Sequence, residues 1–422
     1  MLYKKTILKN GLRIITVPMR ETQTVTVVTM VGVGSRYESE KEAGISHFIE
    51  HMFFKGTEKR PTALSIAEEM DAIGGEFNAF TSKDSTGYYA KVDAKHINTA
   101  LDVISDIYLH SKIEERELEK EKGAIIQELN MYEDMPMRSI GDVFESLLYS
   151  KNNLGREIVG YKKTVAKFQR KDFLNYIKKF YLANDTVICV AGKFDEKKII
   201  TQVKNYFAKM TEGKKPEIKK VIEKQKEPAI KIKFKKTDQT HLVFGVRAYD
   251  LFSEKRFALS LLSIILGGNM SSRLFMEVRE KRGLAYYVRT NVEAFEDCGY
   301  IATQAGVEHE NLKLTIETIL GEYKKIAEEK VSGKELQNAK DYIKGKMAMG
   351  MEASDEVAMF FIEQEVSRRK ILKKAEIFER IDKITADDIL KIAKDIFKKE
   401  KLNLAVIGPH KDGKKLEKLL SA

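Results

Sequence analysis

The sequence predicts an α+β fold with two homologous domains, each a largely antiparallel sheet with helices packed on one face. Its 422 residues exceed what one hydrophobic core usually holds, so two domains of about 200 residues each are expected. The same succession of helices and strands occurs twice along the chain, and a charged segment that contains proline separates the two copies. We expect residues 1–213 to form the first domain, 214–228 a linker and 229–422 the second domain.

Two pairs of matching segments indicate an internal duplication. In each half, a helix with apolar residues about 3.6 positions apart is followed by an apolar strand that ends in glycine. The second such helix contains Asp388, 216 residues after Asp172 in the first. Earlier in each half, a strand beginning with Gly-Tyr leads into another helix. The matching pairs are 172–181 with 187–192 and 388–397 with 404–408, then 87–89 with 97–107 and 299–301 with 312–320. Two pairs in the same order argue against coincidence.

The linker is identified by its composition. Residues 212–228 contain many lysines and glutamates, prolines at 216 and 228, and few apolar residues. Neither half alternates strands and helices strictly, as a parallel sheet would require. Each half is therefore expected to pack its helices on a mainly antiparallel sheet.

Composition and the first residues predict neither a membrane-spanning nor a secreted protein. No run approaches the 18 apolar residues of a transmembrane helix, and Met1 to Lys5 are followed by no apolar signal segment. Cys189 and Cys298 lie in strand-like apolar stretches, where buried free thiols fit a reducing cytoplasm better than a disulfide does. We therefore expect a cytoplasmic protein that does not bind membranes.

The formal net charge of +11 raises the possibility of nucleic-acid binding. However, the lysines are interleaved with glutamates along the predicted helices, and no nucleic-acid-binding motif is present. Solvated helix faces explain the charge better, so no nucleic-acid partner is expected.

Two histidines in one predicted helix indicate a metal site. Residues 44–55 form an apolar-rich helix in which His47 and His51 are four positions apart and therefore share a face. Glu50 lies beside that face, close to where a water on the metal would sit. This order of residues is the reversed form of a helix motif known from zinc proteases, although the same spacing also occurs by chance.

A catalytic zinc site needs a third protein ligand. Residues 114–129 are predicted to form a helix rich in glutamate, in which Glu121 and Glu128 are seven positions apart and share a face. Most carboxylates of such a helix are ordinary solvated charges. Composition alone does not select the ligand among them.

The helix 44–55 and the two glutamates belong to a larger set of motifs. The other members are Leu8-Lys9-Asn10-Gly11-Leu12, Gly75-Glu76-Phe77-Asn78-Ala79-Phe80-Thr81-Ser82 and the block from Ser272 to Tyr286. With them the chain resembles, over essentially its whole length, the pitrilysin/insulinase family of zinc peptidases, the inverzincins. The resemblance implies that Glu128, 77 residues after His51, completes the zinc site, and that Glu121 supports a ligand histidine. A surface charge remains the alternative for Glu121.

The resemblance also implies a mechanism and a substrate. The zinc ion would lower the pKa of a water to about 7, and Glu50 would take its proton and pass it to the departing amine. Residues 77–81 are expected to form an edge strand to which an extended peptide adds, with Asn78 and Ala79 contacting the substrate. The alternative is that residues 77–81 form a strand that binds no substrate. The expected activity is zinc-dependent endopeptidase cleavage of peptides or unfolded protein segments.

The second half matches the family through Arg279 and Tyr286, which the resemblance implies to be catalytic and substrate-binding residues near the zinc. Other arginines and tyrosines lie nearby, so ordinary surface packing is the alternative. The helix at 257–265, which corresponds to the zinc helix, has no histidine, so one zinc per chain is expected.

The length of the chain bears on assembly. This chain has about half the length of the family's large single-chain members, which close two halves of this size into a clamshell. We therefore expect a homodimer in which Arg279 and Tyr286 act in trans on the partner's zinc. The family also contains catalytically idle members that serve as binding or structural subunits. Idle members typically lose motif residues, whereas this chain keeps them.

Overall fold

The computed structural model describes residues 2–421, which divide into two compact units. Neither unit is one continuous segment. The first contains the residues up to 130 together with 156–218 and 347–373, and the second contains 131–155, 219–346 and the residues from 374 onward. The chain therefore passes between the units several times.

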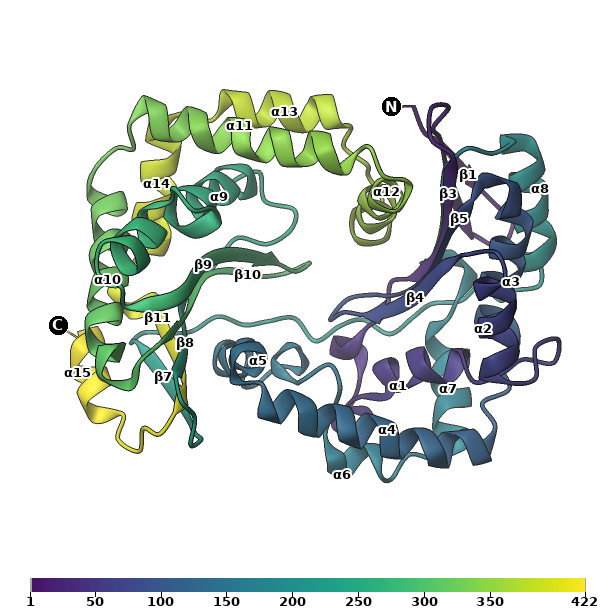
Figure 1. The fold of residues 1–422 in the computed structure, drawn as a ribbon, viewed down its shortest axis with the longest axis horizontal. Helices are drawn as coiled ribbons and strands as arrows, with labels where there is room; N and C mark the ends of the chain where they lie inside the picture. The colour runs from purple at the N-terminus through teal and green to yellow at the C-terminus, as the bar shows by residue number, and fades with distance from the viewer. Residues whose placement is uncertain (1, 422) are drawn as a thin grey trace. The chain divides into compact units, whose positions relative to one another are not determined.

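The first unit is built on a six-stranded sheet with the order β1-β2-β6-β3-β5-β4 (Figure 1). All neighbouring strands run antiparallel except β2 and β6, which are parallel. The strands are β1 (Lys4–Ile7), β2 (Arg13–Pro18), β3 (Thr24–Val31), β4 (Glu76–Thr81), β5 (Thr86–Asp93) and β6 (Thr186–Gly192).

Both faces of this sheet are covered, as the central strand β3 shows. Val25 and Val27 point into the main core of the unit, whereas Val28 and Met30 point into a separate apolar cluster on the other face. This alternation is the two-residue period of a strand buried on both sides. The main core is shared with α1 (Ile45–Phe53), α2 (Ala63–Asp71), α3 (Ile97–His110), α4 (Glu115–Asp134), α6 (Lys162–Val165), α7 (Arg170–Phe180) and α8 (Glu196–Phe207).

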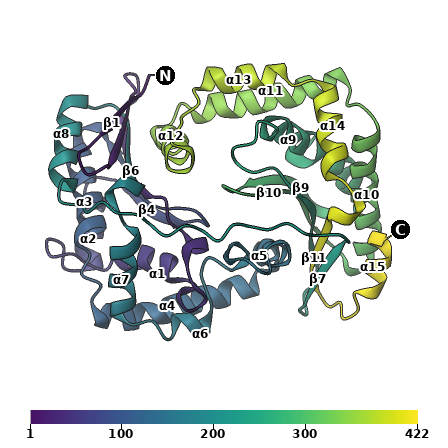
Figure 2. The same cartoon turned by 180° about the vertical axis from the view of Figure 1, so that it is seen from behind.

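One helix from the second half of the sequence covers the other face of the first sheet. This helix is α12 (Ser354–Arg368), which packs on β3 and β6 through Val357, Phe361 and Ile362. The second unit shows the reciprocal arrangement, because α5 (Pro136–Leu148), from the first half, packs on β7, β8 and β11 (Figure 2). The two halves of the chain have thus exchanged one helix each.

The second unit repeats the topology of the first. Its five-stranded sheet has the order β7-β11-β8-β10-β9, which matches β2-β6-β3-β5-β4 strand for strand, including the single parallel pair. The strands are β7 (Ala229–Phe234), β8 (Thr240–Ala248), β9 (Ala285–Ala294), β10 (Gly299–Val307) and β11 (Leu402–Gly408). The helices are α5, α9 (Arg256–Ser263), α10 (Leu312–Glu328), α11 (Gly333–Gly350), α13 (Lys374–Lys383), α14 (Ala386–Ile396) and α15 (Lys414–Ser421).

These observations confirm the predicted α+β fold with two homologous, largely antiparallel sheets. The expectation that helices cover one face only was wrong for the first sheet, because α12 covers its other face. The predicted linker falls in the stretch without helix or strand between α8 and β7. The predicted domain bounds follow the chain continuously, whereas the compact units exchange α5 and α12. Within residues 2–421, no helix is both long enough and apolar enough to cross a membrane.

Candidate metal centre

The two histidines lie where the sequence predicted, on one face of α1. Gly44 precedes the first helical residue with φ of +97°, a conformation that favours glycine, and a Cβ there would lie 2.6 Å from the carbonyl oxygen of Val159. The helix then runs nine residues, and the rings of His47 and His51 stand 4.6 Å apart between centroids. The spacing of four residues thus brings both imidazoles to one place.

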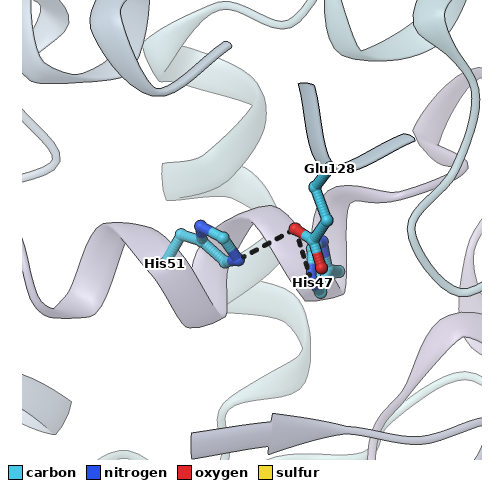
Figure 3. A group of neighbouring side chains, drawn as sticks. All are labelled: His47, His51 and Glu128. Carbon is cyan, nitrogen blue, oxygen red and sulfur yellow. Dashed lines mark ion pairs between the residues drawn. The ribbon is translucent and has the colours of Figure 1, made fainter. Parts of the chain in front are cut away.

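The long helix α4 brings Glu128 to the two histidines. Its Oε2 lies 3.6 Å from Nε2 of His47 and 3.6 Å from Nε2 of His51 (Figure 3). One ligand atom from each of the three residues lies within 4.8 Å of the others. Among the described residues, these three form the one group of at least three such side chains arranged to hold a metal ion.

The three side chains fit a zinc ion. Two imidazole nitrogens and one carboxylate oxygen are a known set of protein ligands for catalytic zinc. Bonds of about 2.1 Å in a tetrahedral arrangement place neighbouring ligand atoms about 3.4 Å apart. The 3.6 Å separations between Glu128 and each histidine are close to that value.

Glu121 is hydrogen-bonded to Nδ1 of His51, the ring nitrogen that does not face Glu128. Its Oε1 lies 2.9 Å from Nδ1 of His51, and its Oε2 lies 2.6 Å from Nζ of Lys55. Burial opposes ionisation of this carboxyl, but the hydrogen bonds from His51 and Lys55 outweigh it and lower the pKa of Glu121. Because an ionised carboxylate only accepts hydrogen bonds, Nδ1 carries the proton and Nε2 keeps its lone pair for a metal.

Glu50 stands beside the histidines and is held by the last residue of β4. The Thr81 hydroxyl donates a hydrogen bond of 2.5 Å to Oε2 of Glu50. Burial raises the pKa of Glu50, and this effect outweighs the stabilisation of the charged form by Thr81 and His51. A carboxyl with a raised pKa is suited to accept a proton near neutral pH.

Asn78 and Ala79 lie on β4, which stands at the end of the first sheet and is paired only with β5 among the described residues. Asn78 is exposed and Ala79 is half-buried. The strand therefore offers one unpaired edge in the same unit as the metal centre.

Arg279 and Tyr286 belong to the second unit. Arg279 lies in the short π-helical turn Phe275–Glu280, and Tyr286 is the second residue of β9. The guanidinium carbon of Arg279 is 5.7 Å from the centre of the Tyr286 ring, and the tyrosine is 77% exposed. The two side chains therefore form an exposed pair available for contact with another molecule.

Lys55, which pairs with Glu121, is a contact beside the centre that the sequence analysis did not single out. It lies two residues beyond the end of α1, so helical spacing does not predict its position. The role of Thr81 was also missed, because a hydrogen bond between a strand and a helix leaves no local signal. The other histidines, at positions 96, 110, 241, 309 and 410, lie outside the metal group.

Comparison with known proteins gives matches along most of the chain. The family described as "Insulinase (Peptidase family M16)" matches residues 13–162, and "Peptidase M16 inactive domain" matches residues 167–343. An uncharacterized zinc protease of Bacillus subtilis, YmxG, is 35% identical over 409 residues, which cover 95% of this chain and 97% of that protein. An uncharacterized zinc protease of Rickettsia felis is 37% identical over 409 residues, covering 96% and 97%.

Solved structures match the whole fold. A protease from Helicobacter pylori superposes with a TM-score of 0.91 over 97% of this chain and 99% of that chain, at 21% identity. At this identity the likeness concerns the fold alone.

Proposed function

Because the chain belongs to the insulinase family, peptidase family M16, we propose that it is a zinc-dependent endopeptidase that hydrolyses peptides or unfolded protein segments. The observation that supports this most directly is the convergence of His47, His51 and Glu128, with Glu50 beside them. A zinc ion held there supplies Lewis-acid chemistry, lowering the pKa of a water and polarising a carbonyl. We propose one such ion per chain.

The side chains around the centre have separate tasks. Glu50 takes a proton from the attacking water and delivers it to the departing amine. Its Oε2 is engaged by Thr81, so we assign the proton to Oε1. Glu121 keeps His51 in the tautomer that presents Nε2.

The substrate is held as an extended strand. A peptide added to the free edge of β4 gains backbone hydrogen bonds whatever its sequence, and Asn78 and Ala79 contact it. This mode suits unfolded segments, because a folded protein rarely exposes an extended strand to a new partner. Tyr286 donates to the carbonyl oxygen as negative charge develops, and Arg279 holds a substrate carbonyl.

We further propose that two copies assemble as a homodimer, in which each chain lends Arg279 and Tyr286 to the metal centre of its partner. The exposed Arg279–Tyr286 pair is compatible with such a role. The two free, buried cysteines support the proposal that the enzyme works in the cytoplasm.

The test combines metal analysis with hydrolysis of a panel of unstructured peptides. The parent chain should contain about one zinc per chain and cleave peptides, and Glu128→Ala should lose both the zinc and the activity. Full zinc occupancy in Glu128→Ala would refute the ligand assignment. Zinc binding by a parent chain that cleaves no peptide would favour the alternative of an idle binding or structural subunit.

A further inference from the structure

Glu38 is a buried carboxylate, only 1% exposed, that the proposed reaction does not use. It lies just before the metal-binding helix α1. The amide N–H of Gly44 donates to its Oε2 at 2.8 Å, and the amide N–H of Ser46 donates to its Oε1 at 2.9 Å. Both oxygens of one carboxylate are thus committed to the start of α1.

The start of α1 needs such a partner. The first amide groups of a helix have no acceptor within the helix, and they carry the positive end of its dipole. A side chain at the preceding residue usually supplies the acceptor, but Gly44 has no side chain. Glu38 replaces that cap from six residues upstream, and its negative charge is favourable there.

The contact between Glu38 and Ser46 lies next to the metal centre, since the residue after Ser46 in the helix is His47. The Ser46 hydroxyl is in turn 3.0 Å from the hydroxyl of Tyr176 on α7. Ser46, the residue before His47, is therefore held at its amide by Glu38 and contacts Tyr176 through its hydroxyl.

Further contacts fix the position of the residues at the start of α1. The Thr164 hydroxyl donates to the carbonyl oxygen of Ala43 at 2.7 Å, and Gly44 lies too close to Val159 and Gly160 to accept a Cβ. The Arg156 guanidinium donates to the carbonyl oxygen of Glu38 at 3.0 Å. The backbone of Glu38 is thus itself anchored.

The duplicated unit provides an internal comparison. Its matching helix, α9, has no histidine. The acidic residues that precede α9 in sequence, Asp250 and Glu254, are not buried. Of these two matching helices, the one that carries the candidate metal ligands begins beside a buried carboxylate and the other does not, which supports a role for Glu38 in holding α1.

From this geometry we propose that Glu38 is a positioning residue of the metal centre. By holding the amide groups of Gly44 and Ser46, it sets the start of α1 and with it the position of the His47 imidazole. The inference rests on the metal centre of the proposed function.

The experiment measures zinc affinity by competition with a chelator in Glu38→Gln, with Glu40→Gln as the matched control. Glu40 is an exposed carboxylate in the separate turn Glu40–Glu42, two residues from Glu38. A glutamine at position 38 accepts only one of the two amide groups, so zinc affinity should fall by about 10- to 100-fold. The control should stay within about twofold of the parent, and saturating zinc should restore most of the peptidase kcat in Glu38→Gln.

The outcomes separate positioning from simple stabilisation. A lower melting temperature in EDTA with an unchanged zinc dissociation constant would show that Glu38 only stabilises the fold and would overturn the inference. If Glu38→Gln does not fold, Glu38→Asp keeps the charge but shortens the reach, and it should give an intermediate loss of zinc affinity; parental affinity there would overturn the inference. A parent chain whose zinc binding is unaffected by His47→Ala would refute the proposed metal centre, and the inference with it.

Discussion

Glu121 contacts His51 at the ring nitrogen that does not face Glu128. Its Oε1 lies 2.9 Å from Nδ1, whereas Nε2 of the same ring lies 3.6 Å from Glu128. Glu121 therefore favours the tautomer that leaves Nε2 available, and Glu128 lies beside that Nε2 as the proposed third metal ligand. Two glutamates that share one face of α4 thus have different tasks.

Glu121→Gln should weaken zinc binding by about 10- to 100-fold, because the neutral amide no longer attracts the Nδ1 proton of His51. Chelator competition measures the zinc dissociation constant. Glu119→Gln is the matched control, since Glu119 is an exposed carboxylate on the same helix and pairs with Lys122. Equal zinc affinity in the two variants would show that Glu121 does not support the ligand.

Glu50→Gln should keep the zinc and the fold but lower peptide hydrolysis by about 10²- to 10⁴-fold, because the amide cannot take the proton from water. Steady-state hydrolysis, zinc content and the melting temperature are measured on the same preparation. Glu58→Gln, an exposed change seven residues beyond His51, serves as the control. Cleavage by Glu50→Gln at close to the parental rate would mean that another group is the base.

The metal helix could be predicted from the sequence, because the ligand spacing and the helix period coincide at His47 and His51. Composition and spacing could not choose between Glu121 and Glu128, since both lie on the same face, and the choice of Glu128 rested on the family resemblance. One signal was nevertheless present. Glu121 occupies a position of the buried stripe formed by Leu118, Ile125 and Leu129, where an ordinary solvated glutamate is not expected.

The exchange of α5 and α12 was not predictable from the sequence. Apolar residues such as Phe144 and Phe361 show that each helix is buried on one side, but they do not specify which sheet the helix covers. The capping role of Glu38 was hidden for a similar reason. Its acceptors are used by backbone amides, which have no signature in the side-chain pattern.

Glu365→Ala should destabilise the first unit by about 3 to 5 kcal/mol, because it leaves a buried cation without its partner. Glu365 is buried on α12 and accepts hydrogen bonds from Arg13 of β2 at 3.1 Å, and it pairs with Lys5 of β1 at 2.5 Å. Urea unfolding measures the loss, and the exposed Glu352→Ala is the control. Equal stability in the two variants would mean that this ion pair does not hold the exchanged helix.

The stability of the zinc-free protein should depend on the ionisation of Glu38. Burial raises its pKa from 4.5 to about 7, although the amides of Ser46 and Gly44 oppose the shift and Glu42 adds to it. A carboxyl whose pKa is higher in the folded state stabilises the fold fully below pH 4.5, and this contribution is lost as the pH rises through about 7.

The free energy of unfolding of the parent, minus that of Glu38→Gln, should therefore fall by about 3 kcal/mol between pH 4.5 and pH 8. Taking the difference between the two proteins removes the titrations that they share. Urea unfolding in EDTA at a series of pH values supplies both curves. A difference that is constant over this range would show that Glu38 does not titrate within it.

The proposed homodimer predicts that two inactive chains can restore each other's activity. Glu50→Gln damages the metal centre and leaves Tyr286 intact, whereas Tyr286→Phe damages the contribution to the partner and leaves Glu50 intact. If the tyrosine acts in trans, a mixed dimer contains one centre with both residues intact and one with neither. Free exchange of equal amounts makes about half of the dimers mixed, so about a quarter of the parental activity should return.

Mixing Glu50→Gln with Glu128→Ala is the control and should restore nothing, because both changes fall in the metal-binding unit and every centre then carries one of them. Subunit exchange is verified independently with two differently tagged chains. Absence of recovery despite demonstrated exchange, or full activity from a strict monomer, would mean that Tyr286 does not act on the partner's metal centre.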